Sequence, residues 1–350
     1  MNKRAKEILQ VVLFSAIGVL LFWYAIKGEN INEIIRILKS ANYWWVLVSL
    51  CFALLSNISR AVRWNMLMKP LGVTPRLRNT FAAVSVAYFA NLAIPRLGEV
   101  SRCAIIGKYE NAPVSKVFGT VIIERIIDAF TLLLILIITV ALQFKVLEEF
   151  TYTYVIDPLK AKFEVLAHSG AKFYCIVAGG IIVVILLAYF GFRLLKKMHF
   201  YEKLKKIIKE FIEGIRTIEN IEHKGWFIFH SIFIWFMYYL MAYVCFFCFG
   251  ATAHLDLLAA MSVLVFGSIG FAAPVQGGFG AYHALVTQTL LLYGIARPDG
   301  LAYAIITHTS QTLGMIIFGL GSLVALPLMN ADRKENVIKE EAVTDTNAPL

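Results

Sequence analysis

Residues 91–102 read NLAIPRLGEVSR and directly follow the apolar run TFAAVSVAYFA at 80–90. Far downstream, residues 270–283 read GFAAPVQGGFGAYH, which again combines an apolar run, a proline and glycines. Proline removes a backbone N–H donor and glycine frees the backbone, so both stretches predict a break in an apolar helix. We therefore expect two helices that stop partway through a membrane, the first with charged residues beside its break.

The composition of the whole chain predicts a helical membrane protein. The chain has 350 residues, of which 59% are hydrophobic and 16% charged, and its mean hydropathy is +0.72. Soluble domains do not carry this much apolar sequence. The net charge of +10 indicates lysines and arginines beside the membrane and not a nucleic-acid partner. The sequence contains no nucleotide loop, no HExxH motif and no paired Cys/His metal spacing, so we expect no enzyme activity, no cofactor and no metal site.

Apolar runs of about 20 residues predict the membrane-spanning helices of an all-α, polytopic fold. About six are expected, at 8–26, 43–68, 114–143, 171–195, 226–250 and 301–328. Two further pairs of runs, 79–112 and 257–296, are too polar or too short to cross twice, and we interpret them as re-entrant helical hairpins. A plain eight-segment bundle with kinked helices is the alternative. Trp44, Trp226 and Tyr303 lie near run ends, where aromatic residues anchor helices at the interface.

The distribution of lysine and arginine predicts the orientation of these segments, because cationic loops stay in the cytoplasm. The strongest cationic loop, 193–224, and both termini lie inside only if 79–112 enters from the cytoplasm and returns. The second hairpin then enters from the outer side. Segments 43–143 and 226–328 thus form an inverted repeat, a plan in which broken helices meet at the bilayer centre of many transporters.

The expected domain organisation is one transmembrane domain over residues 1–330, in the cytoplasmic (inner) membrane. Residues 200–222 place apolar side chains at helical spacing opposite lysines, which predicts an amphipathic helix on the cytoplasmic surface. Residues 331–350 are polar and are expected to form a disordered cytoplasmic tail.

Charged residues inside the apolar runs indicate a functional site, because each costs at least about 2.5–3.5 kcal/mol to insert. Glu124 and Asp128 lie four residues apart on one helical face, next to Arg125. Arg60 and Arg63 lie three residues apart on another helix. We predict that the two sets pair across neighbouring helices. The alternative is that the arginines extend to the cytoplasmic surface.

The two helix breaks add further residues to this predicted polar centre. They are Arg96, Gly98, Glu99 and Arg102 at the first break, and Gly277, Gly278, Gly280, His283, His308 and Gln311 in the second half. Gly98 is expected to permit the first turn. Free amides at the start of each returning helix attract an anion, and arginines bind phosphate. We therefore predict a site for a phospholipid or polyprenyl-phosphate headgroup, with histidines that either carry a coupling proton or pack between helices.

Four motifs occur together in one order: SRAVRWNMLMKPLG (59–72), NLAIPRLGEVSR (91–102), IIERIIDAF (122–130) and PVQGGFGAYHA (274–284). In these motifs, over nearly its whole length, the chain resembles the lysylphosphatidylglycerol synthase transmembrane-region family, whose members are also called flippase-like membrane proteins. The resemblance implies an integral inner-membrane protein. In the multiple-peptide-resistance proteins this module flips aminoacylated phosphatidylglycerol, which a separate soluble domain makes, and we expect this chain to hold only the membrane module.

The resemblance also implies which residues form the site. The matching positions are Arg63 with Trp64; Asn91, Pro95, Gly98, Glu99 and Arg102; Glu124, Arg125 and Asp128; and Gly277, Gly278 and Gly280. Two positions depart from the family pattern. Gln276 stands where members often have proline, and His283 stands where many have glutamate, which changes the charge offered to a substrate or a coupled proton.

These observations predict a lipid translocase that is not an enzyme. Arg60, Arg63, Arg96 and Arg102 are expected to bind phosphate, while the acids balance them or bind an amine. The second reading is a non-transporting membrane subunit that presents lipid to a separate synthase or glycosyltransferase. A transferase is the third reading, and the sequence shows no catalytic domain for it. The expected partners are a membrane lipid and, in the second reading, a lipid-modifying enzyme; the oligomeric state is left open.

Overall fold

The computed structural model describes residues 3–144, 148, 157, 160 and 221–331. The chain forms two compact units, one of Met1–Leu136 with Asn220–Leu350 and one of Ile137–Glu219, and the sites discussed below lie in the first. The predicted span at 171–195 and tail at 331–350 fall outside the described residues, except for Ala331. So does the predicted amphipathic helix at 200–222, apart from its last two residues.

The described part of the chain is built from helices and short turns, without a strand. The helices are α1 (Lys3–Ile26), α2 (Ile31–Lys39), α3 (Trp44–Met68), α4 (Leu77–Ala93), α5 (Leu97–Glu110), α6 (Val114–Leu142), α11 (Lys224–Cys245), α12 (Leu257–Ala272), α13 (Ala281–Leu291) and α14 (Arg297–Met329). Within this part, three helical segments are long and apolar enough to cross a membrane, at Trp44–Leu71, Lys224–Cys248 and Arg297–Met329. The prediction of an all-α, polytopic membrane protein is confirmed.

Helices α3 and α11 form an antiparallel pair in the first unit. Ser49 near the start of α3 donates to the carbonyl of Met241 near the end of α11, and Ser59 lies 2.8 Å from His230 Nδ1 further along. Two predicted interfacial anchors, Trp44 and Trp226, are 65% and 60% exposed, as a lipid-facing ring must be.

The third predicted anchor is wrong. Tyr303 is fully buried, and its hydroxyl donates to the carbonyl of Ala242 at 2.7 Å. Because α14 begins several residues earlier than the apolar run suggested, Tyr303 lies inside the helix bundle and not at its edge.

Helices α4 and α5 form an antiparallel hairpin, called hairpin 1 below. Asn79 at the start of α4 donates to Glu110 Oε1 at the end of α5, at 2.6 Å. The turn between the helices contains Pro95 and is made by Arg96, whose φ is +69°. Gly98 is helical and is required for a different reason, because a Cβ at this position would collide with the carbonyl of Ala87. The expectation that Gly98 permits the turn is therefore wrong; it permits the close approach of α5 to α4.

Helices α12 and α13 form a second antiparallel hairpin, called hairpin 2. Ser262 of α12 lies 2.7 Å from the hydroxyl of Tyr293, just beyond α13. The tip contains a single 3-10 turn, Gln276–Gly278. In this hairpin the glycines do supply the turn. Gly277, Gly278 and Gly280 have φ values of +56°, +72° and +79°, which residues with a side chain rarely adopt.

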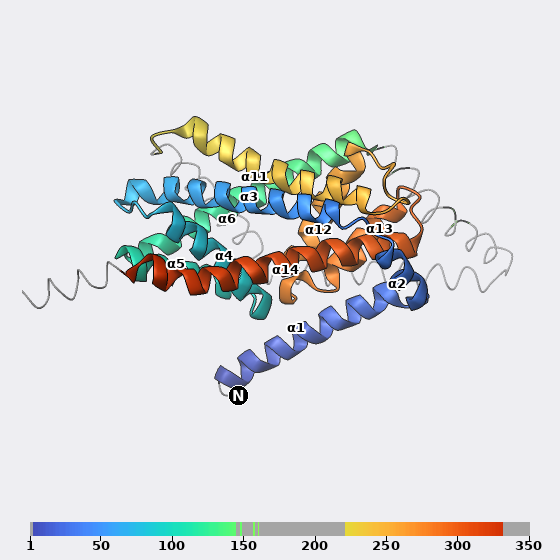
Figure 1. Cartoon of the computed structure of the whole chain (residues 1–350), viewed down its shortest axis with the longest axis horizontal. Coiled ribbons are helices and arrows are strands. Elements are labelled where there is room, and N and C mark those ends of the chain that lie inside the picture. The colour runs from blue at the N-terminus through green and yellow to red at the C-terminus, as the bar shows by residue number, and fades with distance from the viewer. Residues whose placement is uncertain (1–2, 145–147, 149–156, 158–159, 161–220, 332–350) are drawn as a thin grey trace, which may run out of the picture. The chain divides into compact units, whose positions relative to one another are not determined.

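The long helix α14 packs on both hairpins and thereby shows how they are arranged (Figure 1). Near its start, Gly300 packs against Leu290 at the base of hairpin 2. About two turns later, His308 Nε2 lies 2.9 Å from the carbonyl of Gly277 at the tip of hairpin 2. Hairpin 2 therefore runs along the first half of α14 with its tip toward the middle.

Hairpin 1 runs along the second half of α14 in the opposite sense. Gly319 lies against Phe89 near the tip of hairpin 1. At the end of α14, Asn330 Nδ2 donates to Asn79 Oδ1 at the base of hairpin 1, at 3.0 Å. The two hairpins thus extend from opposite ends of the same helix.

The tips of the hairpins meet beside the middle of α14. A Cβ on Gly277 would lie 2.9 Å from the side chain of Leu92 in hairpin 1. A 33-residue helix is about 50 Å long and exceeds the hydrocarbon thickness of about 30 Å, so we expect its middle to lie near the bilayer centre. That the hairpins re-enter from opposite leaflets stays a prediction.

Candidate functional site

Five ionised side chains from three helices form one buried group, called the charged cluster: Arg60 and Arg63 of α3, Arg102 of α5, and Glu124 and Asp128 of α6. The spacing of three residues on α3 and four on α6 puts each pair on one helical face. Arg60 Nη1 donates to both Glu124 and Asp128, and Arg63 Nη2 donates to Asp128 Oδ1 at 2.7 Å. The predicted pairing across helices is confirmed. Because Arg60 and Arg63 are only 4% and 0% exposed, the alternative of surface-directed arginines is wrong.

Arg102 joins the cluster from hairpin 1. Its Nη1 donates to Glu124 Oε2 at 3.0 Å, and its guanidinium lies 4.7 Å from the centre of the Trp64 ring. The indole N–H of Trp64 donates to Thr120 Oγ1 at 2.8 Å, which fixes the ring. Trp64 was predicted only as the neighbour of Arg63. Its place one turn after Arg60 on the same face of α3 was the signal that pointed to a larger role.

A second ion pair, called the outer pair, lies at the edge of the cluster. Arg125 Nη2 lies 3.2 Å from Glu99 Oε1, and the two side chains are 43% and 21% exposed. Arg125 follows Glu124 directly in the chain, so it points away from the buried face and reaches Glu99 on α5. The structure thus brings together seven of the predicted site residues.

Two tyrosines that sequence reasoning missed extend the polar network. Arg60 Nη2 donates to the hydroxyl of Tyr238 at 3.3 Å, and this hydroxyl lies 3.4 Å from that of Tyr88. Tyr238 belongs to α11 and Tyr88 to α4. No residue pattern in either helix separates these tyrosines from the many other aromatic residues, so they become visible only in the folded chain.

Three predicted residues at the tip of hairpin 1 lie outside the cluster. Arg96 is exposed, and its side chain makes no ion pair within the described residues. Its backbone takes the positive φ of the turn, and the binding of phosphate by its side chain stays a prediction. Asn91 Oδ1 accepts from the amide of Gly98 at 2.7 Å and so caps α5, while Pro95 precedes the turn residue. Asn91 and Pro95 therefore shape the hairpin.

The two predicted histidines form a separate group at the tip of hairpin 2. The rings of His283 and His308 are 4.7 Å apart, and Phe271 stacks on His308 at 5.3 Å. His283 Nδ1 accepts from the amide of Gly280 at 3.3 Å, so its proton is on Nε2 when the ring is neutral. His308 Nε2 faces the carbonyl of Gly277 and therefore donates.

The polar centre was expected to combine side chains from both halves, but within the described residues no hydrogen bond or ion pair joins the histidines to the charged cluster. Gln311, one turn beyond His308, is partly buried without a hydrogen bond to the described chain. No group of three or more His, Cys, Asp or Glu in the described segments is placed to hold a metal ion.

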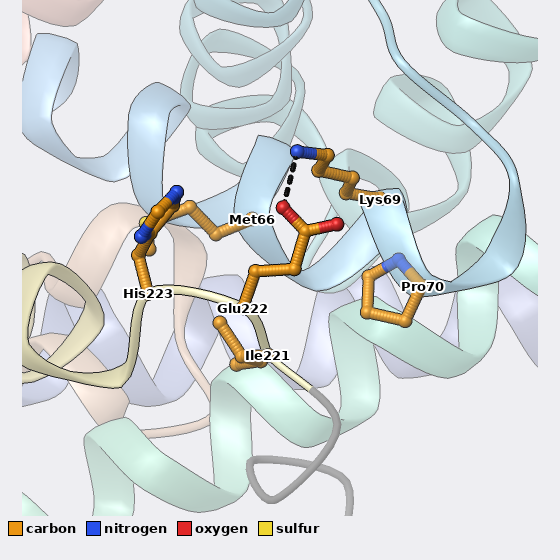
Figure 2. A pocket seen from close by; sticks show the side chains of 6 residues that line it. All are labelled: Met66, Lys69, Pro70, Ile221, Glu222 and His223. Atoms are coloured by element: carbon orange, nitrogen blue, oxygen red, sulfur yellow. Dashed lines mark hydrogen bonds and ion pairs between the residues drawn. The ribbon is translucent and has the colours of Figure 1, made fainter.

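Two hollows lie where α3 ends, away from the cluster. One, of about 50 Å³, is lined by Met66, Lys69, Pro70, Ile221, Glu222 and His223, and Figure 2 shows Lys69 donating to Glu222 across it at 2.6 Å. The other, of about 310 Å³, is lined by residues 71–74 and 110–113. Neither contains a predicted site residue.

The family model for the lysylphosphatidylglycerol synthase TM region matches residues 8–319, a range that holds both hairpins and the charged cluster. The chain belongs to this family. The match is to a transmembrane region and names no catalytic region.

Two membrane proteins of archaea are similar to parts of the chain. A UPF0104 membrane protein of Methanocaldococcus jannaschii is 24% identical over 220 residues, which are 60% of this chain and 62% of the relative. A UPF0104 membrane protein of Pyrococcus horikoshii is 28% identical over 127 residues, 35% of this chain and 37% of the relative. The chain thus spans about three fifths and about two fifths of their lengths. No solved structure matches the chain.

Proposed function

We propose that this family member is a flippase-like protein that moves a phospholipid or lipid-linked headgroup across the cytoplasmic membrane, and that it is not itself an enzyme. The observation that carries the proposal is the charged cluster. Five residues with ionised side chains, each residue at most 9% exposed, lie between helices of a membrane protein. Such residues are rare in membranes and mark substrate or ion pathways.

The hairpins give this proposal a route for the headgroup. Helix ends at membrane depth are tolerated only where protein covers them or where they line a polar cavity. Hairpin 1 supplies Arg102 and Glu99 within two turns of its tip, and the tip contacts hairpin 2. A lipid headgroup that passes the tips loses its contacts with water and gains contacts with the arginines, while the acyl chains of the lipid stay in the bilayer.

A second candidate is a membrane subunit that presents lipid to a separate synthase or glycosyltransferase. The family description supports it, because that description names a transmembrane region of a synthase. This candidate predicts stable co-purification with a lipid-modifying enzyme and no lipid movement by the chain alone.

The test is reconstitution of the purified chain into vesicles with a fluorescent phospholipid, whose movement is read by quenching the outer leaflet. We expect movement well above that in protein-free vesicles. Glu99→Gln should slow it at least about tenfold, because the variant breaks a charge-assisted pair at the site. Glu222→Gln, which breaks an exposed pair outside the cluster, is the matched control and should leave the rate unchanged.

Two outcomes of this experiment would contradict parts of the proposal. No movement above the protein-free rate contradicts the flippase and favours the presenting subunit. Movement that Glu99→Gln leaves intact contradicts the placement of the route beside the charged cluster.

A further inference from the structure

The charged cluster carries one positive charge more than its acids neutralise. Its three buried arginines face two buried carboxylates, and the outer pair adds one charge of each sign. Among the described residues the excess is therefore +1, whether or not the outer pair is counted. A buried, uncompensated charge is costly, so the cluster favours a bound anion that carries a single charge.

The unpaired donors of the cluster gather on Arg102. Arg60 and Arg63 each leave only Nε without a partner, whereas Arg102 leaves both Nε and Nη2 unpartnered among the described residues. These two nitrogens form one edge of the planar guanidinium and donate in parallel, which fits two oxygens of a phosphate. Arg102 is 2% exposed, and its guanidinium lies over the ring of Trp64. The edge is thus a preformed oxyanion fork.

An unpaired acceptor lies on the same helix as this fork. Glu99 precedes Arg102 by three residues on α5, so the two side chains share one helical face. Glu99 Oε1 pairs with Arg125, while the buried Oε2 has no partner in the described chain. Since Glu99 already has a cationic partner, its free oxygen suits a neutral hydroxyl donor better than a second cation.

We propose that Arg102 and Glu99 form a binding site for a monoanionic phosphodiester whose headgroup carries a hydroxyl group. The phosphate sits on the Arg102 fork and the hydroxyl donates to Glu99 Oε2. The inference rests on the proposed function in one respect, that the ligand is a lipid headgroup; it adds that this headgroup is anionic and not aminoacylated.

The charge excess of the cluster determines which lipid headgroups the site prefers. An aminoacyl group adds positive charge to the headgroup and removes the net attraction. A phosphomonoester carries close to two negative charges above its second pKa of about 6 and overcompensates the cluster. A zwitterionic phosphocholine lipid offers the phosphate without net charge and without a hydroxyl donor.

The experiment measures binding and not transport. The full chain, purified in detergent at pH 8, is titrated with phosphatidylglycerol, lysylphosphatidylglycerol, phosphatidic acid or phosphatidylcholine, and binding is read from thermal stabilisation. Soluble glycerophosphate and inorganic phosphate are titrated in parallel, to separate a lipid ligand from a free anion. We expect phosphatidylglycerol to bind at least about tenfold more tightly than any of the others.

Two variants locate the site. Arg102→Lys keeps the charge but loses the fork, and should weaken phosphatidylglycerol binding at least about tenfold. Glu99→Gln raises the excess charge to two and should move the preference toward phosphatidic acid by at least about tenfold. Arg76→Lys alters an ion pair with Glu110 at the base of hairpin 1 and is the matched control, with unchanged binding.

The proposal is overturned if lysylphosphatidylglycerol binds as tightly as phosphatidylglycerol, if a soluble phosphate binds equally well, or if Arg102→Lys binds like the wild type. Should Arg102→Lys not fold, the order of lipids on the wild type and the shift in Glu99→Gln decide. Selective binding without lipid movement would support this binding site and contradict only the proposed flippase function. Lipid movement without selective binding would support the flippase function and contradict only this binding site.

Discussion

Hairpins 1 and 2 have the same plan, two short antiparallel helices joined by a broken tip, yet their tips are stabilised by different interactions. Hairpin 1 is attached to its neighbours by charge, through Arg102 to α6 and through Glu99 to Arg125. Hairpin 2 is attached through backbone and rings, with His308 on the carbonyl of Gly277 and Phe22 of α1 on His283 at 4.9 Å.

This difference teaches that similar sequence breaks need not make equivalent sites. In hairpin 1 the turn residue is an arginine and the glycine serves packing, so the side chains beyond the tip remain available for a ligand. In hairpin 2 three glycines form the tip and the polar side chains are enclosed by aromatic rings. We therefore expect changes to the charged side chains of hairpin 1 to act through electrostatics, and changes at the tip of hairpin 2 to act through hydrogen bonding and ring packing.

The largest expected effect comes from removing the shared carboxylate of the cluster. Glu124→Gln leaves Arg60, Arg63 and Arg102 facing Asp128 alone, and breaking a buried charge network costs about 3–5 kcal/mol of unfolding free energy. We expect a strongly lowered melting temperature in detergent. A variant that melts within a degree of the wild type would contradict the account of how hairpin 1 is attached.

The next effect concerns close packing at the hairpins. Gly98→Ala places a methyl group on the carbonyl of Ala87 and should cost about 1–3 kcal/mol of stability, the usual cost of overpacking. Gly119→Ala is the matched control, because a Cβ there meets nothing within 4 Å and alanine favours a helix. Equal melting temperatures for the two variants would show that the close approach of α5 to α4 at Gly98 is not needed for stability.

A smaller effect is expected at the tip of hairpin 2. His308→Phe keeps a ring against Phe271 but leaves the carbonyl of Gly277 without its donor, a loss of about 1 kcal/mol. His254→Phe, at an exposed position before α12, controls for the added apolar ring. Thermal melting of both variants checks the prediction. If His308→Phe lowered the melting temperature as much as Glu124→Gln, the proposed difference between the hairpins would be contradicted.

The smallest effect is expected at the exposed pair of Figure 2. The hydrogen bond and charge of Lys69 lower the pKa of Glu222. A lowered pKa in the folded state means that the pair stabilises the fold above the ordinary pKa of glutamate and that this contribution disappears as the pH falls. Because the pair is exposed, Glu222→Gln should leave the melting temperature unchanged from pH 4 to pH 8. A clear loss at neutral pH would contradict this.

Much of the fold follows from the sequence, because apolar length and periodicity report helices directly. The pairing of Arg60 and Arg63 with Glu124 and Asp128 also followed, since their spacings define two helical faces that must neutralise each other. The separation of His283 and His308 from the cluster did not follow. Which helical faces meet depends on packing, and no spacing within a single helix contains that information.

The residues that sequence reasoning missed share a physical reason. Tyr88 and Tyr238 are aromatic residues in a chain with 13% aromatic content, so their residue type carries little signal. Arg96 occupies a backbone position that is usually left to glycine, which its residue type did not indicate; that its side chain binds phosphate stays a prediction. Backbone conformation at a tip depends on how closely the helices approach, which for hairpin 1 depends on Gly98.

The central claim, that the hairpins enter from opposite faces and meet at their tips, has one most direct test. The five native cysteines are replaced by alanine, and single cysteines are introduced by Asn111→Cys after hairpin 1 and His254→Cys before hairpin 2, both exposed. A membrane-impermeant maleimide is then applied to inside-out and right-side-out vesicles. The account predicts labelling of Asn111→Cys only in inside-out vesicles and of His254→Cys only in right-side-out vesicles. Labelling of both from the same side would contradict it.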